Sequence, residues 1–400
     1  MEEKKLVPKL RFPGFTEPWE QRKLGEITTY RNGAGHEEKQ SAVGKYEVVN
    51  LNSISIDGGL KPSGKFIDEE TETLIKDDLV MVLSDVGHGD LLGRVAIIPE
   101  NNRFVLNQRV ALLRNNGIAD IKYLFSYINA HQRYFKLQGA GSSQLNISKE
   151  SVETFEVLLP SKDEQKKIGE CFTNLDHLIT LHHRKLEHLK LKKKSLLQKL
   201  FPKEGEVYPE LRFPGFTDPW EQRKGDEVFI SVSDKGYPQL PVLSASQELG
   251  MVYRDENGID IHHNKSNEDT YKRVLPGQFV IHLRSFQGGF AYSNVEGITS
   301  PAYTVITFKN PELHYGLFWK QVFKSLTFIK HLETITYGIR DGRSISFSDF
   351  RSLKLCYPTY GEQKFIGDGL EKTDNLITLH QRKLEHLQLL KKALLQQLFV

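Results

Sequence analysis

The chain has few cysteines, no long apolar run and little net charge, and each shortage argues against a class of protein. Cys171 and Cys356 are the only cysteines, and neither lies in a CxxC or Cys/His cluster, so we expect no zinc site or redox pair and a reducing cytoplasm. The first nine residues lack the apolar core of a signal peptide, and no apolar run approaches the roughly 18 residues of a membrane span. A formal net charge of +3 permits a polyanionic partner without requiring one.

The chain consists of two copies of one module. Residues 10–23 (LRFPGFTEPWEQRK) and 211–224 (LRFPGFTDPWEQRK) are identical at thirteen of fourteen positions, and residues 176–201 match residues 374–399 almost as closely. The intervening inserts, roughly 25–155 and 225–355, share little sequence. A constant frame with two unlike inserts suggests two different targets, and the alternative is one duplicated fold whose middle has drifted.

The second match in each module predicts a long helix. After Pro160 and Pro358, Ser161 with Glu164 and Thr359 with Glu362 predict capping boxes. Apolar residues then alternate by fours and threes, which is typical of a coiled coil, so we expect the second helix to partner the first, each about 60 Å long. The predicted seam residues are Ile168, Phe172, Leu175, Ile179, Leu186, Leu189, Leu196 and Leu200 in the first helix, and Ile366, Leu370, Ile377, Leu384, Leu387, Leu394 and Leu398 in the second.

Two polar features of these helices have competing interpretations. His182 and His380 occupy equivalent seam positions, but no third ligand is evident, so we favour buried polar residues that fix the register and expect no metal. The four lysines within residues 190–194 could contact phosphate. The second copy has Gln388 and Leu390 in place of two of them, which favours a solvated helix face.

The order and duplication of these segments resemble the specificity subunits of type I restriction-modification systems over essentially the whole chain. The resemblance is carried by WEQR at residues 19–22 and 220–223, by the domain-to-helix junctions at 159–165 and 357–363, and by the long helices. It implies an α+β fold, in which two target recognition domains are separated by two helices packed as an antiparallel coiled coil with pseudo-twofold internal symmetry. The implied boundaries are 1–160 and 210–357 for the recognition domains, 161–201 and 358–400 for the helices, and 202–209 for the linker.

The same resemblance implies a function. Each recognition domain would bind one half of a bipartite, asymmetric site in double-stranded DNA, with the helices setting the spacer. Two methyltransferase subunits would assemble on this scaffold, and restriction (motor-nuclease) subunits would join them. The chain itself would be non-catalytic, without a cofactor, and cytoplasmic, with S-adenosylmethionine and ATP bound by its partners. A long rod agrees in scale with the roughly 34 Å of one duplex turn, but the sequence recognised is not predicted.

Polar loops in the inserts are the predicted DNA contacts, because they combine base-reading side chains with glycines that allow close backbone approach. We expect strands at 46–50, 79–83 and 110–113 and a helix at 123–137 in the first insert. Its predicted contacts are Ser84, His88, Asn107, Gln108, Arg109, Ser142, Ser143, Gln144 and Asn146. Those of the second insert are Arg284, Ser285, Gln287, Tyr303, Tyr337, Arg340, Arg343 and Ser344, with Arg340 and Arg343 the strongest single candidates. Ordinary turn chemistry is the alternative for any one of them.

Two other classes of function remain open from the residues alone. The segment SPAY at 300–303 approaches the D/N/S-P-P-Y/F loop of an amino-methyltransferase, but it lacks the second proline, and no glycine-rich cofactor loop follows a strand. Walker A, HExxH and G-x-S-x-G motifs do not occur, which argues against an enzyme. A duplicated coiled-coil adaptor that binds proteins is the third hypothesis.

Overall fold

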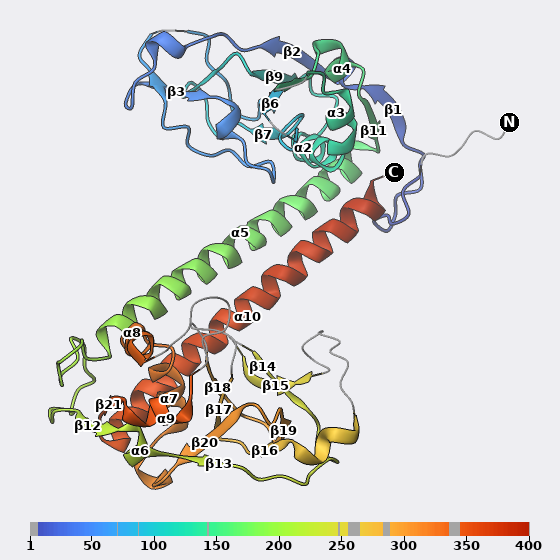
Figure 1. Cartoon of the computed structure of the whole chain (residues 1–400). Coiled ribbons are helices and arrows are strands. Elements are labelled where there is room, and N and C mark those ends of the chain that lie inside the picture. The colour runs from blue at the N-terminus through green and yellow to red at the C-terminus, as the bar shows by residue number, and fades with distance from the viewer. Residues whose placement is uncertain are drawn as a thin grey trace. The chain divides into compact units, whose positions relative to one another are not determined.

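The computed structural model describes residues 7–69, 71–86, 88–141, 144–246, 249–254, 265–282, 289–335 and 345–399. The chain forms two compact units, Met1–His183 with Arg382–Val400, and Arg184–Gln381. The long helices α5 (Lys162–Lys199) and α10 (Tyr360–Leu398) contribute residues to both units. Each unit therefore contains one globular domain and a part of each long helix (Figure 1). Within the described ranges, no helix combines the length and apolarity that a membrane span needs.

The domain of unit 1 is organised around a four-stranded antiparallel sheet whose strands are buried on both faces. Leu79 and Met81 belong to one core with the helices, whereas Val80 and Val82 belong to a second core with the other sheet. This division follows from the alternation of side chains along a strand. The sheet has the order β2 (Thr28–Asn32), β9 (Val110–Asn115), β5 (Leu79–Val82), β7 (Val95–Ile97), and the other sheet the order β4 (Phe66–Ile67), β3 (Tyr46–Val49), β8 (Phe104–Leu106).

The helices of unit 1 cover the first face of that sheet. Asp120 caps α2 (Ile121–Ala130) by accepting hydrogen bonds from the backbone N–H groups of Lys122 and Tyr123, both at 3.0 Å. The single helix predicted at residues 123–137 is wrong, because the backbone leaves the helical conformation at His131, and α3 (Gln132–Gln138) starts anew there. Shorter helices are α1 (Leu24–Ile27), α4 (Lys149–Glu153) and the 3-10 turns Glu37–Lys39 and Leu51–Ser53.

The domain of unit 2 has the same central sheet, although the two inserts share little sequence. Its strands follow the order β13 (Phe229–Val232), β20 (Thr304–Phe308), β17 (Phe279–Ile281), β18 (Phe290–Tyr292), so each strand has a counterpart in unit 1. The two inserts therefore share one sheet architecture although their sequences have diverged. The other elements are β14 (Leu243–Ser246), β15 (Gly250–Tyr253), β16 (Lys272–Val274), β19 (Gly297–Thr299), α6 (Gly225–Val228), α7 (Gly316–Val322), α8 (Leu326–Ile335), α9 (Phe347–Ser352) and the 3-10 helices Lys265–Thr270 and Pro311–Leu313.

The duplicated opening segments lie against the starts of the long helices. β1 (Glu20–Lys23) pairs with β11 (Glu156–Leu159), and β12 (Glu221–Lys224) pairs with β21 (Lys354–Tyr357). Arg11 donates two hydrogen bonds of 2.8 Å to the buried carboxylate of Glu164. Arg212 does the same to Glu362, at 2.8 and 2.7 Å. Ser161 caps α5 as predicted, because its Oγ accepts from the N–H of Glu164 at 3.4 Å, but the Glu164 carboxylate binds Arg11 in place of the predicted Ser161 amide.

A buried glutamine ties each long helix to its own domain. Gln165 donates to the carbonyl oxygen of Pro160 and accepts from the backbone N–H of Asp120, both at 2.8 Å. Gln363 donates to the carbonyl oxygen of Pro358 at 2.8 Å and accepts from the N–H of Tyr315 at 2.9 Å. These bonds connect the first turn of α5 to the start of α2, and the first turn of α10 to the start of α7. The repeated domain-to-helix junctions at residues 159–165 and 357–363 therefore fix the start of each long helix to its domain.

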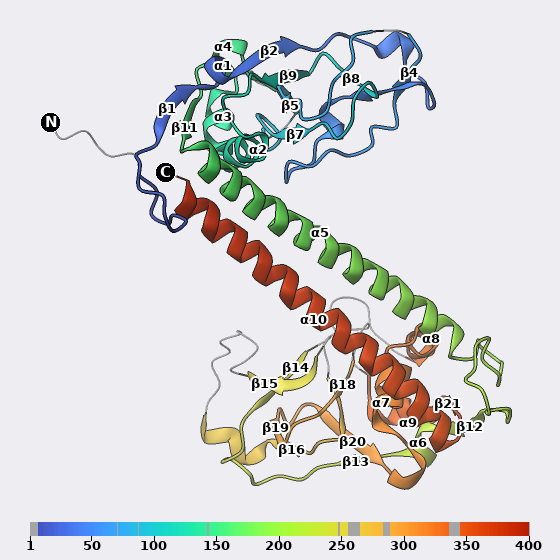
Figure 2. The same ribbon diagram turned by 180° about the vertical axis from the view of Figure 1, so that it is seen from behind.

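Each unit also holds the end of the opposite long helix, so the helices run antiparallel within it. In unit 1, Leu398 and Phe399 are buried in the same core as Ile168 and Phe172, and the N–H of Leu10 donates to the carbonyl oxygen of Gln397 at 2.9 Å. Figures 1 and 2 both show this end of α10 beside the start of α5. In unit 2 the corresponding pair, residues 200–201, packs in a core with Ile366 and Leu370. The N–H of Leu211 donates to the carbonyl oxygen of Lys199 at 2.8 Å.

Along the long helices, every predicted seam residue is buried or half-buried. An ion pair recurs at equivalent positions beside the seam. Asp176 pairs with Lys391 in unit 1, and Asp374 pairs with Lys193 in unit 2, both at 2.5 Å. Burial raises the pKa of Asp176 even though Lys391 opposes the shift, so this pair stabilises the carboxylate only in part. The apolar seam therefore supplies most of the packing energy between the helices.

Candidate nucleic-acid interface

Three loops that are distant in sequence meet at Leu83 in unit 1. The N–H of Leu83 donates to the carbonyl oxygen of Arg109 at 3.0 Å, and its carbonyl oxygen accepts from the N–H of Ile147 at 2.9 Å. The next residues form β6 (Ser84–Val86), which pairs antiparallel with β10 (Gln144–Asn146). The segments that carry the predicted residues 84–88, 107–109 and 144–146 are thus brought together.

The polar side chains of β6 and β10 interact across the two strands. Gln144 Nε2 donates to Ser84 Oγ and, at 3.2 Å, to Asn146 Oδ1, while Asn146 Nδ2 donates to the carbonyl oxygen of Gln144 at 3.2 Å. Ser84 is buried, Gln144 is half-buried and Asn146 is exposed. Two amides therefore lie at the surface on a short, hydrogen-bonded ribbon.

The 107–109 loop divides into residues with internal bonds and residues that face solvent. The Asn107 side chain is buried, and its Oδ1 accepts from the N–H of Gln108 at 2.8 Å. The Gln108 amide donates to Glu37 at 2.8 Å. Arg109 is exposed, as is His88 on the neighbouring loop, and the Arg109 side chain makes no hydrogen bond or ion pair within the described part of the chain. Arg109 is thus the cation of this region that is most available to a ligand.

Cationic side chains surround Asp90 in the connection between β6 and β7. A hydrogen bond from Lys136 at 2.8 Å lowers the pKa of Asp90, and the charges of His88 and Arg94 lower it further. Asp85 does not add an exposed negative charge, because its carboxylate is buried and accepts the N–H groups of Val86 at 2.9 Å and Leu91 at 3.0 Å. The carboxylates of this connection are therefore either buried, as in Asp85, or paired with a lysine, as in Asp90.

The strand registers give the corresponding positions in unit 2. Val82 pairs with Val110 and Ile281 pairs with Thr304, so Tyr303 occupies the place of Arg109, immediately before the equivalent strand. Tyr303 is half-buried, and its ring centroid lies 6.2 Å from that of His282. The connections β17–β18 and α8–α9 correspond to those that carry β6 and β10. Nine predicted residues lie outside the described residues: Ser142, Ser143, Arg284, Ser285, Gln287, Tyr337, Arg340, Arg343 and Ser344.

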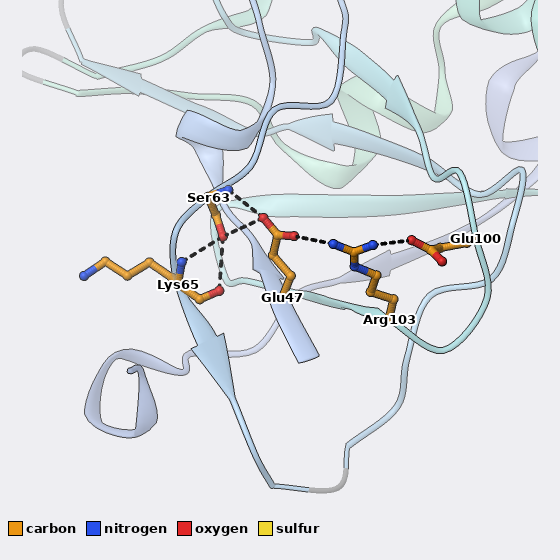
Figure 3. A network of polar contacts seen from close by, with 5 residues as sticks. All are labelled: Glu47, Ser63, Lys65, Glu100 and Arg103. Atoms are coloured by element: carbon orange, nitrogen blue, oxygen red, sulfur yellow. Dashed lines mark hydrogen bonds and ion pairs between the residues drawn. The ribbon is translucent and has the colours of Figure 1, made fainter. Parts of the chain in front are cut away.

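A second polar cluster in unit 1 has a structural explanation. Glu47 on β3 is buried, and its carboxylate accepts from the N–H of Ser63 at 2.7 Å and from its hydroxyl at 3.4 Å (Figure 3). Arg103 lies 3.8 Å from Glu47 and donates to Glu100 at 2.6 Å. These contacts anchor the loop before β4.

Among the residues that the structure describes, no cluster of three or more His, Cys, Asp or Glu side chains has the arrangement of a metal site.

Sequence reasoning missed one residue of the β6–β10 ribbon. Val86 is 65% exposed at the end of β6, opposite Gln144 in the register. Its apolar type gave no reason to include it among base-reading candidates. The available signal was its position, two residues after Ser84 and therefore on the same face of the strand.

The chain belongs to the family of the type I restriction modification DNA specificity domain, whose sequence model matches residues 16–191 and 219–389. It is 25% identical to the MjaX specificity subunit assigned to a type I restriction enzyme of Methanocaldococcus jannaschii, over 95% of this chain and 92% of that protein. It is 23% identical to the type I restriction enzyme MjaVIII specificity subunit of the same organism, over 96% and 92%. The crystal structure of the S subunit of a type I restriction-modification system from M. genitalium has the same fold, with a TM-score of 0.66 and 16% identity over 98% of this chain and 99% of that one.

This chain is therefore a specificity subunit with two recognition domains, which is a non-catalytic DNA-recognition component of type I restriction-modification systems. The complex formed by a type I restriction-modification system contains methyltransferase and restriction subunits and acts on DNA. The predicted α+β fold, with a duplicated domain and two long antiparallel helices, is confirmed. The family match favours DNA recognition over the amino-methyltransferase and the protein-binding adaptor.

Proposed function

We propose that the two domains bind the two halves of a bipartite, asymmetric DNA site. The observation that carries this proposal is the placement of different side chains on the same loops of one shared scaffold. Arg109 and Tyr303 are the clearest case, because they precede equivalent strands and offer a guanidinium in one domain and a phenol in the other. A common fold with unlike contact residues suits two readers of different base sequences.

Among the described residues, the contacts we propose in the first domain are His88, Arg109, Gln144 and Asn146, whereas the predicted Ser84 is buried and holds the Gln144 amide. The proposed contact in the second domain among the described residues is Tyr303. The other proposed contacts of that domain lie outside the described residues and are Arg284, Ser285, Gln287, Tyr337, Arg340, Arg343 and Ser344. Asn107 and Gln108 hold the first surface in shape through their internal bonds. Arginine, histidine and amide side chains are the groups that recognise base edges and phosphates most often.

The long helices set the distance between the two half-sites in this proposal. α5 has 38 residues and α10 has 39, which correspond to roughly 57–59 Å of helix. Their heptad seam and the repeated ion pairs at Asp176 and Asp374 support a pairing of fixed register. A spacer of fixed register gives the gap between half-sites a fixed length.

The same helices serve as the scaffold for two methyltransferase subunits. Exposed leucines recur at equivalent positions of the two copies, with exposed fractions of 41% and 44% for Leu178 and Leu376, and 53% and 49% for Leu181 and Leu379. Leucines exposed in this way favour burial against a partner. Their duplication favours two copies of one partner, with restriction subunits joining the assembly and S-adenosylmethionine and ATP bound by those partners.

The experiment is a selection of bound duplexes from a random-sequence pool, using the full chain with its methyltransferase subunits. The wild type should enrich two half-sites at a constant gap. Replacing residues 25–155 with the insert of another specificity subunit should change one half-site only, whereas a change in both would refute independent readers. A control at increasing salt should weaken binding steeply if phosphates are contacted. Methyl transfer by the isolated chain would instead support an enzyme.

A further inference from the structure

The β6–β10 ribbon has one face packed against its domain, and its other face, the open face, exposes Val86 and Asn146 while Gln144 is half-buried and Ser84 is buried. Leu145 packs against the main core of unit 1, and the buried Asp85 carboxylate holds the N–H groups of Val86 and Leu91 at 2.9 and 3.0 Å. Leu145 and Asp85 lie on the face opposite to Ser84 and Val86, because side chains alternate along a strand. The ribbon is therefore fixed from behind, so little ordering is needed when its open face binds a ligand.

The open face presents two amides and one aliphatic side chain. Register pairs Val86 with Gln144 and Ser84 with Asn146, so the four side chains share this face. Gln144 Nε2 donates to Ser84 Oγ and Asn146 Oδ1, which leaves Gln144 Oε1 as an acceptor and one N–H of Asn146 Nδ2 as a donor. Val86 is 65% exposed and has no partner strand beyond Gln144 within the described ranges.

This set of groups matches one kind of base pair. The major groove admits a two-stranded β-ribbon, and an A·T pair presents there the N7 acceptor and N6 donor of adenine beside the C5-methyl group of thymine. Amide side chains pair with the adenine edge, and an aliphatic side chain contacts the methyl group. A G·C pair offers two acceptors on guanine and the N4 donor of cytosine but no methyl group, so the exposed aliphatic side chain is what favours A·T. The minor groove offers no methyl group either, so Val86 favours the major groove.

We propose that the open face of the β6–β10 ribbon enters the major groove and recognises an A·T pair of the first half-site, with the amides of Gln144 and Asn146 on adenine and Val86 on the thymine methyl group. This inference rests on the proposed function, since it requires the first domain to bind DNA. Beyond the proposed function, it names the base pair that is recognised and assigns a contact to Val86, which was not among the residues predicted from the sequence.

The test uses the full chain with its methyltransferase subunits and the duplex enriched by the selection above, with each dT of the first half-site replaced in turn by dU, which lacks the methyl group. One replacement should weaken binding roughly fourfold, as expected for one buried methyl group. Val86→Ala should weaken binding of the dT duplex and remove that dependence on the methyl group. Val43→Ala is the matched control, because Val43 is 78% exposed on another segment of the same unit, and it should retain the full dT-to-dU difference.

A second variant tests the amide. Gln144→Glu should shift the selected base at one position from adenine towards cytosine, because a carboxylate accepts from the N4 amine of cytosine. The inference is refuted if no dT-to-dU replacement depends on Val86, or if Val86→Ala weakens binding equally on all duplexes, which would indicate a contact with protein or backbone. Failure of the proposed function would look different, because no half-site would then follow the first insert.

Discussion

Phe399, which directly follows the last residue of α10, allows a quantitative test of how unit 1 is held together. Its side chain is 6% exposed, and its ring centroid lies 5.7 Å from that of Tyr123, 5.2 Å from Tyr127 and 5.4 Å from Phe172. Replacing a buried phenylalanine with alanine removes its apolar contacts and leaves a cavity, which costs about 3–5 kcal/mol. For a unit of this size, we expect Phe399→Ala to lower the melting temperature of unit 1 by roughly 6–20 °C.

Native-state hydrogen exchange is the appropriate assay, because it resolves the two units within one chain. Phe399→Ala should reduce the protection of amides in α2 and the first turns of α5, and leave α7 and β20 of unit 2 unchanged. Phe201→Ala should produce the reverse pattern, since Phe201 stacks on Phe318 at 5.7 Å and contacts Trp220 at 6.0 Å in unit 2.

The matched control is Leu389→Ala, in the α10 helix that precedes Phe399, where Leu389 is 67% exposed; it should alter stability by no more than about 0.5 kcal/mol. Unchanged protection of α2 in Phe399→Ala would refute the conclusion that the end of α10 completes the core of unit 1. Equal losses in both units would also refute it, because they would indicate a single cooperative core.

Three further predictions concern the frame of the molecule. Arg11→Met should destabilise unit 1 by about 3–5 kcal/mol in urea unfolding, because Glu164 is left buried without its partner, and a second change, Glu164→Met, should recover most of the loss. Burial lowers the pKa of His314 to about 4, so the unfolded chain binds the extra proton between about pH 6.5 and 4; unit 2 should lose roughly 3 kcal/mol as the pH falls through this window, and His314→Gln should flatten that dependence in the same assay. Deleting residues 186–192 and 384–390 should shorten both helices by roughly 10 Å and narrow the gap between selected half-sites, and an unchanged gap would contradict a spacer role.

The frame could be predicted from the sequence because its signals are local. Heptad spacing placed the long helices, and short continuous apolar runs placed the strands at residues 79–83 and 110–113 close to β5 and β9. The partner of Glu164 could not be predicted in this way. Arg11 lies 153 positions away, and a helix-start pattern indicates only a nearby cap. A charged partner from the opening segment replaced the local one.

The inserts show the opposite case. Their sequences share little, yet their central sheets have the same strand order, because the pairing of distant strands leaves no pattern within a short window. The meeting of residues 84, 109 and 147 at Leu83 likewise depends on two long-range backbone bonds. Residue type was enough to select the amides of Gln144 and Asn146 as candidate contacts. The apolar type of Val86 excluded it, and its place in the candidate site follows only from its exposed position in the β6–β10 ribbon.

The composition of unit 1 has a consequence for biosynthesis. Its core needs Leu398 and Phe399, which leave the ribosome after almost 240 further residues have been made beyond the first domain, whose last strand ends at Leu159. At roughly 5–20 residues per second, the apolar site for those side chains stays uncovered for about 12–48 s in every nascent chain. Unit 2 has no such delay, because Leu200 and Phe201 precede its domain. Premature termination would thus release a first domain with its apolar surface open to chaperones and proteases.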